Sequence, residues 1–429
     1  MESVFFDFHL PNATTWFYVS AIICVALFFR FNRPLSLLNL DLALFFLPMP
    51  GFLLLLEAKG PGRSFAWLVA SSAIVVARCV LDVGLFKRVF APSNINVSGL
   101  VWISFSLFVG LVAVTLDVSN QRHPGPDTSR FPVEAVRTHG EEVIKAQASE
   151  PLSQVRFWTE RGLSLACHIA ILAALIMFAW RHFGSALTGV VLATIHLLLP
   201  YCYLLIPYNP LGVGRWEDTW PMALILWALF LIKIPWLAGG LIGLSIGTVV
   251  FPAFIVPAWI AYYGLQKSIQ FLFAGTLMGL VCLAGLGLSG FYPTFLASRD
   301  WIPWCEPNQW SESLWVSVPW AYRIPLFVLH LVLTIWPLLR FHHGDLARLL
   351  AQSTAALAAI QWWLADRGGV HVLWFWPLFL LVAFRPPMEQ EESSDSARTR
   401  DDNASQTKHP NRPSRRGPLG FLTRKRKES

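Results

Sequence analysis

Long apolar stretches and short polar segments alternate along this chain from residue 14 to residue 384. Many of these stretches approach the roughly 20 residues that an α-helix needs to cross a bilayer. Backbone amides inside a bilayer have no water to bind, so the stretches are expected to be helices. The pattern predicts an all-α fold, a polytopic transmembrane helical bundle of twelve or thirteen spans.

The number of spans depends on residues 236–263. This stretch is long enough for one tilted helix, which gives twelve spans. Alternatively, it forms two short passes because Pro252 and Pro257 each remove a backbone donor, which gives thirteen. Three glycines at four-residue spacing share one helix face here and let a neighbouring backbone approach closely. They are Gly239, Gly243 and Gly247.

The basic residues favour thirteen spans, because Lys and Arg are enriched in cytoplasmic loops. The basic run at residues 424–427 predicts a multi-pass protein of the cell membrane whose C-terminus is cytoplasmic. Thirteen spans place the other basic loops on the same side. Those loops contain Arg30 and Arg33, Lys87 and Arg88, and Arg181 and His182.

Composition supports a membrane protein. Hydrophobic residues make up 55% of the chain and charged residues only 14%, against about 25% charged in a soluble domain. The formal net charge of +7 comes from loops and the tail, so no nucleic-acid partner is expected. The six cysteines show no CxxC pair and no metal-ligand spacing. We therefore expect no disulfide framework, no metal site and no cofactor.

Two domains are expected. Residues 1–384 form the transmembrane domain, with outer polar loops near 118–160, 208–218 and 292–321. Residues 385–429 are rich in Pro, Ser, Arg, Asp and Lys, and they contain few apolar residues. Low hydrophobicity with mixed charge predicts a disordered basic tail.

Few ionisable residues lie within the apolar stretches. Asp41 lies near a helix start, which favours a helix cap or an interfacial charge. Arg78 and Asp82 are four residues apart and are expected to form a local ion pair. His168 and His196 are expected to hydrogen-bond with neighbours instead of binding a metal.

The candidate site combines the polar segments that thirteen spans place on the outer face. Carboxylates accept hydrogen bonds from sugar hydroxyls, aromatic rings stack on apolar sugar faces, and arginine holds phosphate. A carboxylate can also take a proton from an attacking hydroxyl. The predicted catalytic residues are Glu217 and Asp218. The predicted substrate-binding residues are Arg215, Trp216, Asp300 and His371.

A structural interpretation of the same turn remains open. Asp218 or Thr219 is placed to cap a helix that Pro221 opens. Trp216 and Trp220 then serve as anchors at the membrane interface.

One section of the chain resembles the GT-C-type membrane glycosyltransferases, in particular their polyprenyl-phosphate-sugar mannosyltransferase branch. The resemblance covers the polar turn, the run at residues 223–229, the segment PWLAGGLIGL at residues 235–244, and Phe251-Pro252. It implies a lipid-phosphate sugar donor and an acidic base on the outer face. Glu217 and Asp218 are the matching acidic residues, and Arg215 lies near the phosphate.

Two other functions compete with this one. A transporter or lipid-handling protein needs a cavity at the membrane midplane, with charges inside the membrane and internal repeats. The chain has only Asp41, Arg78 and Asp82 as such charges and shows no repeat between its halves. A non-catalytic membrane scaffold is the third interpretation. In each case the expected partner includes membrane lipid.

Overall fold

The fold is described from a computed structural model, for residues 13–56, 61–85, 93–117, 152–202, 216–288, 302–307, 313–339, 344–365 and 367–386. The chain divides into two units, Met1–Pro387 and Met388–Ser429, and the second lies wholly outside the described residues. The predicted disorder of the tail therefore falls outside them. The same holds for much of the predicted outer segments near 118–160, 208–218 and 292–321.

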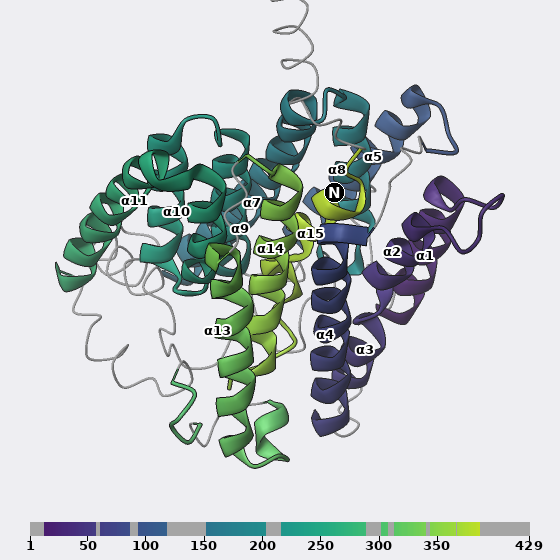
Figure 1. Ribbon diagram of the computed structural model, residues 1–429. Coiled ribbons are helices and arrows are strands. Elements are labelled where there is room, and N and C mark those ends of the chain that lie inside the picture. The colour runs from purple at the N-terminus through teal and green to yellow at the C-terminus, as the bar shows by residue number, and fades with distance from the viewer. Residues whose placement is uncertain are drawn as a thin grey trace, which may run out of the picture. The chain divides into compact units, whose positions relative to one another are not determined.

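Helices and their connections make up the described part of the chain, and no strand occurs among these residues (Figure 1). The predicted all-α fold is confirmed. The α-helices are α1 (Ala13–Phe28), α2 (Leu37–Phe46), α3 (Met49–Leu56), α4 (Pro61–Leu85), α5 (Val97–Asp117), α7 (Leu152–His182), α8 (Ala186–Leu198), α9 (Trp216–Phe230), α10 (Pro235–Thr248), α11 (Val256–Leu288), α13 (Arg323–Leu339), α14 (Leu346–Ala359) and α15 (Trp376–Ala383). The short 3-10 helices are η1 (Pro200–Cys202), η2 (Phe251–Ile255), η3 (Leu314–Val316), η4 (Trp320–Tyr322), η5 (Ile360–Trp362) and η6 (Val372–Trp374).

Six helical segments in the described part of the chain are long and apolar enough to cross a membrane. They are Leu37–Leu56, Gly62–Asp82, Val97–Thr115, Arg161–His182, Phe251–Gly285 and Trp320–Leu339. Shorter apolar helices cover Thr14–Phe28, Ala186–Leu198 and Thr219–Phe230. The predicted multi-pass membrane protein is confirmed at this level.

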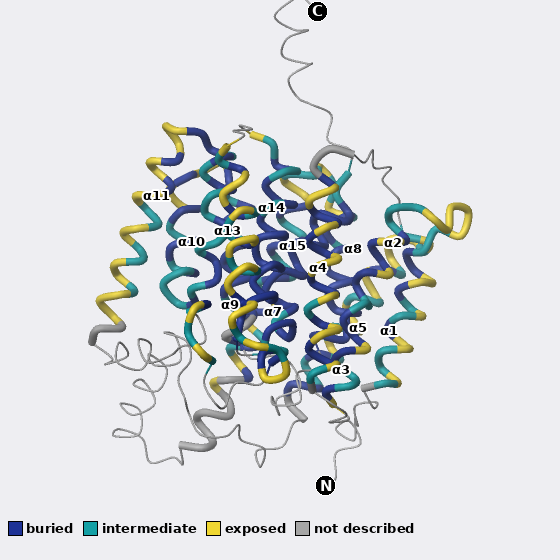
Figure 2. Tube along the Cα trace, turned by 60° about the horizontal axis from the view of Figure 1, so that its bottom comes forward, coloured by how far each residue is buried: buried dark blue, intermediate teal, exposed yellow. Residues whose placement is uncertain are grey.

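The outer helices expose large apolar side chains. Phe105 of α5 is 56% exposed, Phe273 of α11 is 58% exposed, and Trp336 of α13 is 50% exposed. In Figure 2 exposed residues recur along the part of α11 after residue 264, whereas α15 is buried. Apolar surface of this extent is rare on soluble monomers and marks contact with another apolar phase. In this protein the phase is lipid.

The chain reverses direction inside α11, at Gly264. This residue has φ 68° and ψ 175°, which only glycine adopts readily. Trp259 and Phe271 lie on opposite sides of it, and their rings stack with centroids 5.5 Å apart. In a straight helix twelve residues span about 18 Å. Residues 256–263 and 265–288 are therefore two limbs that fold back on each other.

The glycine face of α10 packs directly against the second limb of α11. A Cβ atom added at Gly239 would lie 2.1 Å from the carbonyl oxygen of Phe271, and one at Gly243 would lie 2.2 Å from that of Gly275. The contact advances in the same direction on both helices, so they run parallel. The first limb of α11 connects these two helices in the sequence and runs in the opposite direction. The predicted close backbone approach is confirmed, and residues 236–263 form two helical segments that run in opposite directions, α10 and the first limb of α11.

The described passes alternate between two ends of the bundle. Contacts between connections define one end, here called the basic end. His182 at the end of α7 contacts the Phe230 carbonyl oxygen at the end of α9, at 3.1 Å. The Gly344 amide donates to the carbonyl of Tyr262, next to the reversal. The basic residues of the described chain at this end are Arg30, Arg33, Arg181, Lys233, Lys267, Arg348 and Arg385.

The other end, here called the opposite end, holds the starts of α4, α9 and α13 together with η6. Gly62 at the start of α4 lies against Ser317 there. If α2 and α3 are counted as one segment and the limbs of α11 as two, the described chain forms thirteen helical segments between the two ends. Six helical stretches of the described chain are long and apolar enough to cross a membrane, so the choice between twelve and thirteen spans stays a prediction.

Candidate functional site

The predicted catalytic pair lies in the first turn of α9. The expectation that Pro221 opens this helix is wrong, because α9 begins at Trp216 and contains Pro221. The Thr219 hydroxyl donates to the Trp216 carbonyl at 3.2 Å, within the same turn. Glu217 and Asp218 therefore follow directly after the helix start. Free backbone N–H groups and the helix dipole stabilise negative charge at such positions.

The six predicted site residues differ in how far the structure describes them. Arg215 and Asp300 lie outside the described residues, and the side chains of Glu217 and Asp218 are not described either. Their roles stay predictions. Trp216 is only 6% exposed, so it packs inside the bundle and is not an interfacial anchor. His371 is partly exposed at the opposite end.

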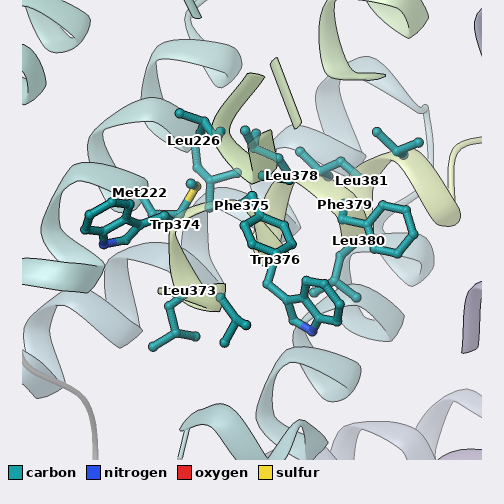
Figure 3. Packing of buried hydrophobic residues seen from close by; sticks show 14 of the residues in the cluster. Met222, Leu226, Leu373, Trp374, Phe375, Trp376, Leu378, Phe379, Leu380 and Leu381 are labelled. Carbon is teal, nitrogen blue, oxygen red and sulfur yellow. The ribbon is translucent and has the colours of Figure 1, made fainter. Parts of the chain in front are cut away.

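His371 belongs to a stack of three aromatic rings. It precedes η6 and stacks on Trp374 with centroids 4.1 Å apart and planes 16° from parallel. Trp374 stacks on Phe251 at the start of η2, at 4.1 Å and 9°. Helix α9 contacts η6, and Figure 3 shows Met222 of α9 in one buried cluster with Trp374. The structure thus places the turn of His371 beside α9.

The turn before His371 is held in place by its backbone. Arg367 has φ 52° and Gly369 has φ 96°. The Gly369 amide donates to the Gln361 side-chain oxygen at 2.8 Å. A Cβ atom at Gly369 would lie 2.6 Å from the Leu68 Cβ in α4, so no larger residue fits there without movement. These contacts fix the position of His371 at the opposite end of the bundle.

A buried ion network lies toward the basic end. Arg78 of α4 donates to both carboxylate oxygens of Asp41 in α2, at 2.7 and 3.0 Å, and to Asp82 at 2.8 Å. Arg385, which follows α15, lies 3.2 Å from the second oxygen of Asp82. The predicted Arg78–Asp82 pair is confirmed. The expected cap or interfacial role of Asp41 is wrong, since Asp41 is fully buried and the Ser36 hydroxyl caps α2.

A second buried cluster joins His168 of α7, His196 of α8 and Cys202 of η1. One ligand atom from each lies within 4.8 Å of the others, and all three side chains are buried. No described Asp or Glu belongs to the group. Sequence spacing gave no signal for it, because the residues come from separate elements and match no local metal-binding motif.

Comparison of this chain with protein-family models, with curated proteins and with solved structures finds no match.

Proposed function

We propose that this protein is a membrane glycosyltransferase that moves a sugar from a polyprenyl-phosphate donor at the opposite end of the bundle. The observation that carries the proposal is the contact between α9 and η6. It brings the helix that begins with Trp216, Glu217 and Asp218 next to the turn that holds His371. Residues far apart in the sequence, which were assigned to one site, therefore belong to neighbouring elements.

The distribution of basic residues supports an outward-facing site. Lys and Arg favour the cytoplasmic side of a membrane, and the basic end collects those of five connections together with Arg385. The basic end then faces the cytoplasm of a cell membrane, and the C-terminus follows it there. Glu217, Asp218 and His371 then face the outer side, where a lipid-linked sugar is presented.

The chemistry of the helix start fits such a donor. Backbone N–H groups at a helix N-terminus bind phosphate oxygens, and Arg215 immediately before α9 adds a cation. The dipole of a helix favours the ionised form of a carboxyl group in its first turn, and this form can accept a proton from an attacking hydroxyl. The His371–Trp374 stack adds a partly exposed aromatic surface for a sugar ring.

The first experiment tests the side of the membrane. Glu217→Cys in a Cys305→Ser background is exposed to a membrane-impermeant maleimide in intact cells. We expect labelling without permeabilisation. The matched control is Ser185→Cys, which lies between α7 and α8 at the basic end and should react only after permeabilisation. The reverse pattern would overturn the orientation and the site together.

The second experiment tests the chemistry. Membranes with the wild-type protein should transfer sugar from a radiolabelled polyprenyl-phosphate mannose. Glu217→Gln or Asp218→Asn should lower the rate by about 100-fold or more, since an amide cannot accept the proton. Glu306→Gln, an exposed carboxylate at the same end, is the control and should keep the activity. Wild-type membranes that move the lipid across the bilayer without transferring sugar would support a transporter instead.

A further inference from the structure

We propose that His168, His196 and Cys202 form a buried binding site for a soft monovalent metal ion, Cu(I). The proposal does not depend on the sugar-transferase function. It rests on how two helices and a turn bring the three side chains together, on the distances between them, and on the charge of the group.

The close packing of α7 against α8 places the two histidines opposite each other. A Cβ atom at Gly189 would lie 2.6 Å from the Ile176 Cα, so the helices approach as closely as their backbones allow. His168 lies two turns before Ile176, and His196 lies two turns after Gly189. In an antiparallel pair these positions face each other. Their ring centroids are 5.8 Å apart.

The way α8 ends places Cys202 close to His196. In an uninterrupted helix Cys202 would lie about 9 Å along the axis from His196. Instead α8 stops at Leu198, Leu199 is extended with ψ 128°, and Pro200 opens the turn of η1. The Cys202 sulfur then lies 3.6 Å from His196 Nε2, and its thiol donates to the His196 carbonyl oxygen at 3.1 Å.

One nitrogen of this group has no hydrogen bond. His196 is fully buried, and its Nδ1 has no partner among the described atoms. His330, equally buried, shows the usual solution. Its Nδ1 accepts from Trp363 Nε1 at 2.8 Å, and its Nε2 contacts the Ala356 carbonyl oxygen at 2.9 Å. Buried polar atoms are normally paired, so His196, unlike His330, is not fixed by hydrogen bonds at both ring nitrogens.

The distances suit a metal ion after a small adjustment. Metal–nitrogen and metal–sulfur bonds of about 2.0–2.3 Å hold neighbouring ligands about 3.5–4 Å apart. The sulfur–Nε2 distance of 3.6 Å already lies in that range. The widest separation in the group is 4.8 Å, so one side chain moves by about 1 Å. A rotation of one imidazole ring supplies this movement.

The charge of the group selects the ion. Cu(I) replaces the thiol proton, which leaves to solvent, and the complex of one thiolate with two neutral imidazoles then has no net charge. Zn²⁺ in the same group leaves one uncompensated positive charge. A buried charge without a partner is costly, and no described carboxylate joins the group to balance it. Thiolate and imidazole are also suitable ligands for Cu(I).

The test uses the full-length protein, purified anaerobically in detergent and titrated with Cu(I) against a competing chelator. We expect one copper per chain, with sulfur and nitrogen neighbours in X-ray absorption spectra and a raised thermal midpoint. Zn²⁺ should bind at least tenfold more weakly. Cys202→Ser and His196→Leu should each abolish both the bound copper and the thermal shift.

Matched controls separate the site from general thiol chemistry. Cys24→Ser removes an equally buried cysteine elsewhere and should leave copper binding unchanged. If Cys202→Ser fails to fold, His196→Leu carries the same comparison. Copper retained equally by the wild type and a folded His196→Leu or Cys202→Ser variant would overturn the proposal. Tighter binding of Zn²⁺ than of Cu(I) would overturn the assignment of a monovalent ion.

Discussion

Two buried polar groups in this protein are built on opposite principles. In the Asp41–Arg78–Asp82–Arg385 network, two carboxylates meet two guanidinium groups, and Arg78 binds Asp41 through two parallel hydrogen bonds. In the His168–His196–Cys202 group, His196 Nδ1 has no partner. A network that satisfies its own charges fixes the packing of helices. The His168–His196–Cys202 group has no such balance of charges, and its three potential ligand atoms lie within 4.8 Å of one another.

The largest effect is expected from breaking the network at its centre. Arg78→Met leaves Asp41 and Asp82 buried without their shared cation. Removing one partner of a buried ion pair costs about 3–5 kcal/mol. We expect a loss of this size in the free energy of unfolding in detergent. A loss below about 1 kcal/mol would show that water reaches the network.

A packing contact without charged groups gives the reference for that effect. Gly243→Leu forces a side chain into the space where α10 meets the backbone of Gly275. Overpacking of this kind costs about 2–3 kcal/mol. Gly240→Leu is the matched control, because nothing lies within 4 Å of a Cβ atom there. Equal thermal midpoints for the two variants would contradict the tight contact.

The two kinds of buried histidine should differ in the same assay. His330→Leu leaves the Trp363 indole N–H and the Ala356 carbonyl without their partner. A buried group that loses its hydrogen bond costs about 1–3 kcal/mol. His196→Leu, measured without metal, should cost less, because it removes a nitrogen that is already unpaired. A larger loss for His196→Leu would make the His196 group structural.

The smallest effect is expected at the surface. Arg348 pairs with Asp345 at 2.8 Å, with 30% and 36% of their side chains exposed. Exposed pairs contribute little, because water and salt screen them. Arg348→Met should change the free energy of unfolding by about 0.5 kcal/mol or less. A loss of stability comparable to that of Arg78→Met would show that burial does not determine how much an ion pair contributes in this protein.

Residue spacing along one helix predicts some of these features. The others depend on contacts between residues far apart in the sequence, which spacing does not reveal. The Arg78–Asp82 pair follows from a four-residue interval on one helix, and the glycine face of α10 follows from the same interval. Arg385 is more than three hundred positions from Asp82, so its partner appears only once the helices are packed.

The start of α9 shows the limit of a local rule. Proline favours the first turn of a helix, yet α9 begins at Trp216 and Pro221 lies inside it. The neighbourhood of α9 and His371 was expected from a topology argument. The His196–Cys202 contact depends on how α8 ends, which no residue interval in the sequence encodes.

The reversal at Gly264 has a consequence for how the chain enters the membrane. η2 and the first limb of α11 together span about 20 Å, whereas a bilayer core is about 30 Å thick. Such a limb is too short to be integrated by itself during synthesis, so it enters together with the second limb as a helical hairpin. Lys267 is exposed just after the tip, and a lysine there fits the cytoplasmic side that the proposed orientation gives to this end. In the proposed orientation, the hairpin therefore depends on one glycine that reverses the chain and one lysine that marks its cytoplasmic tip.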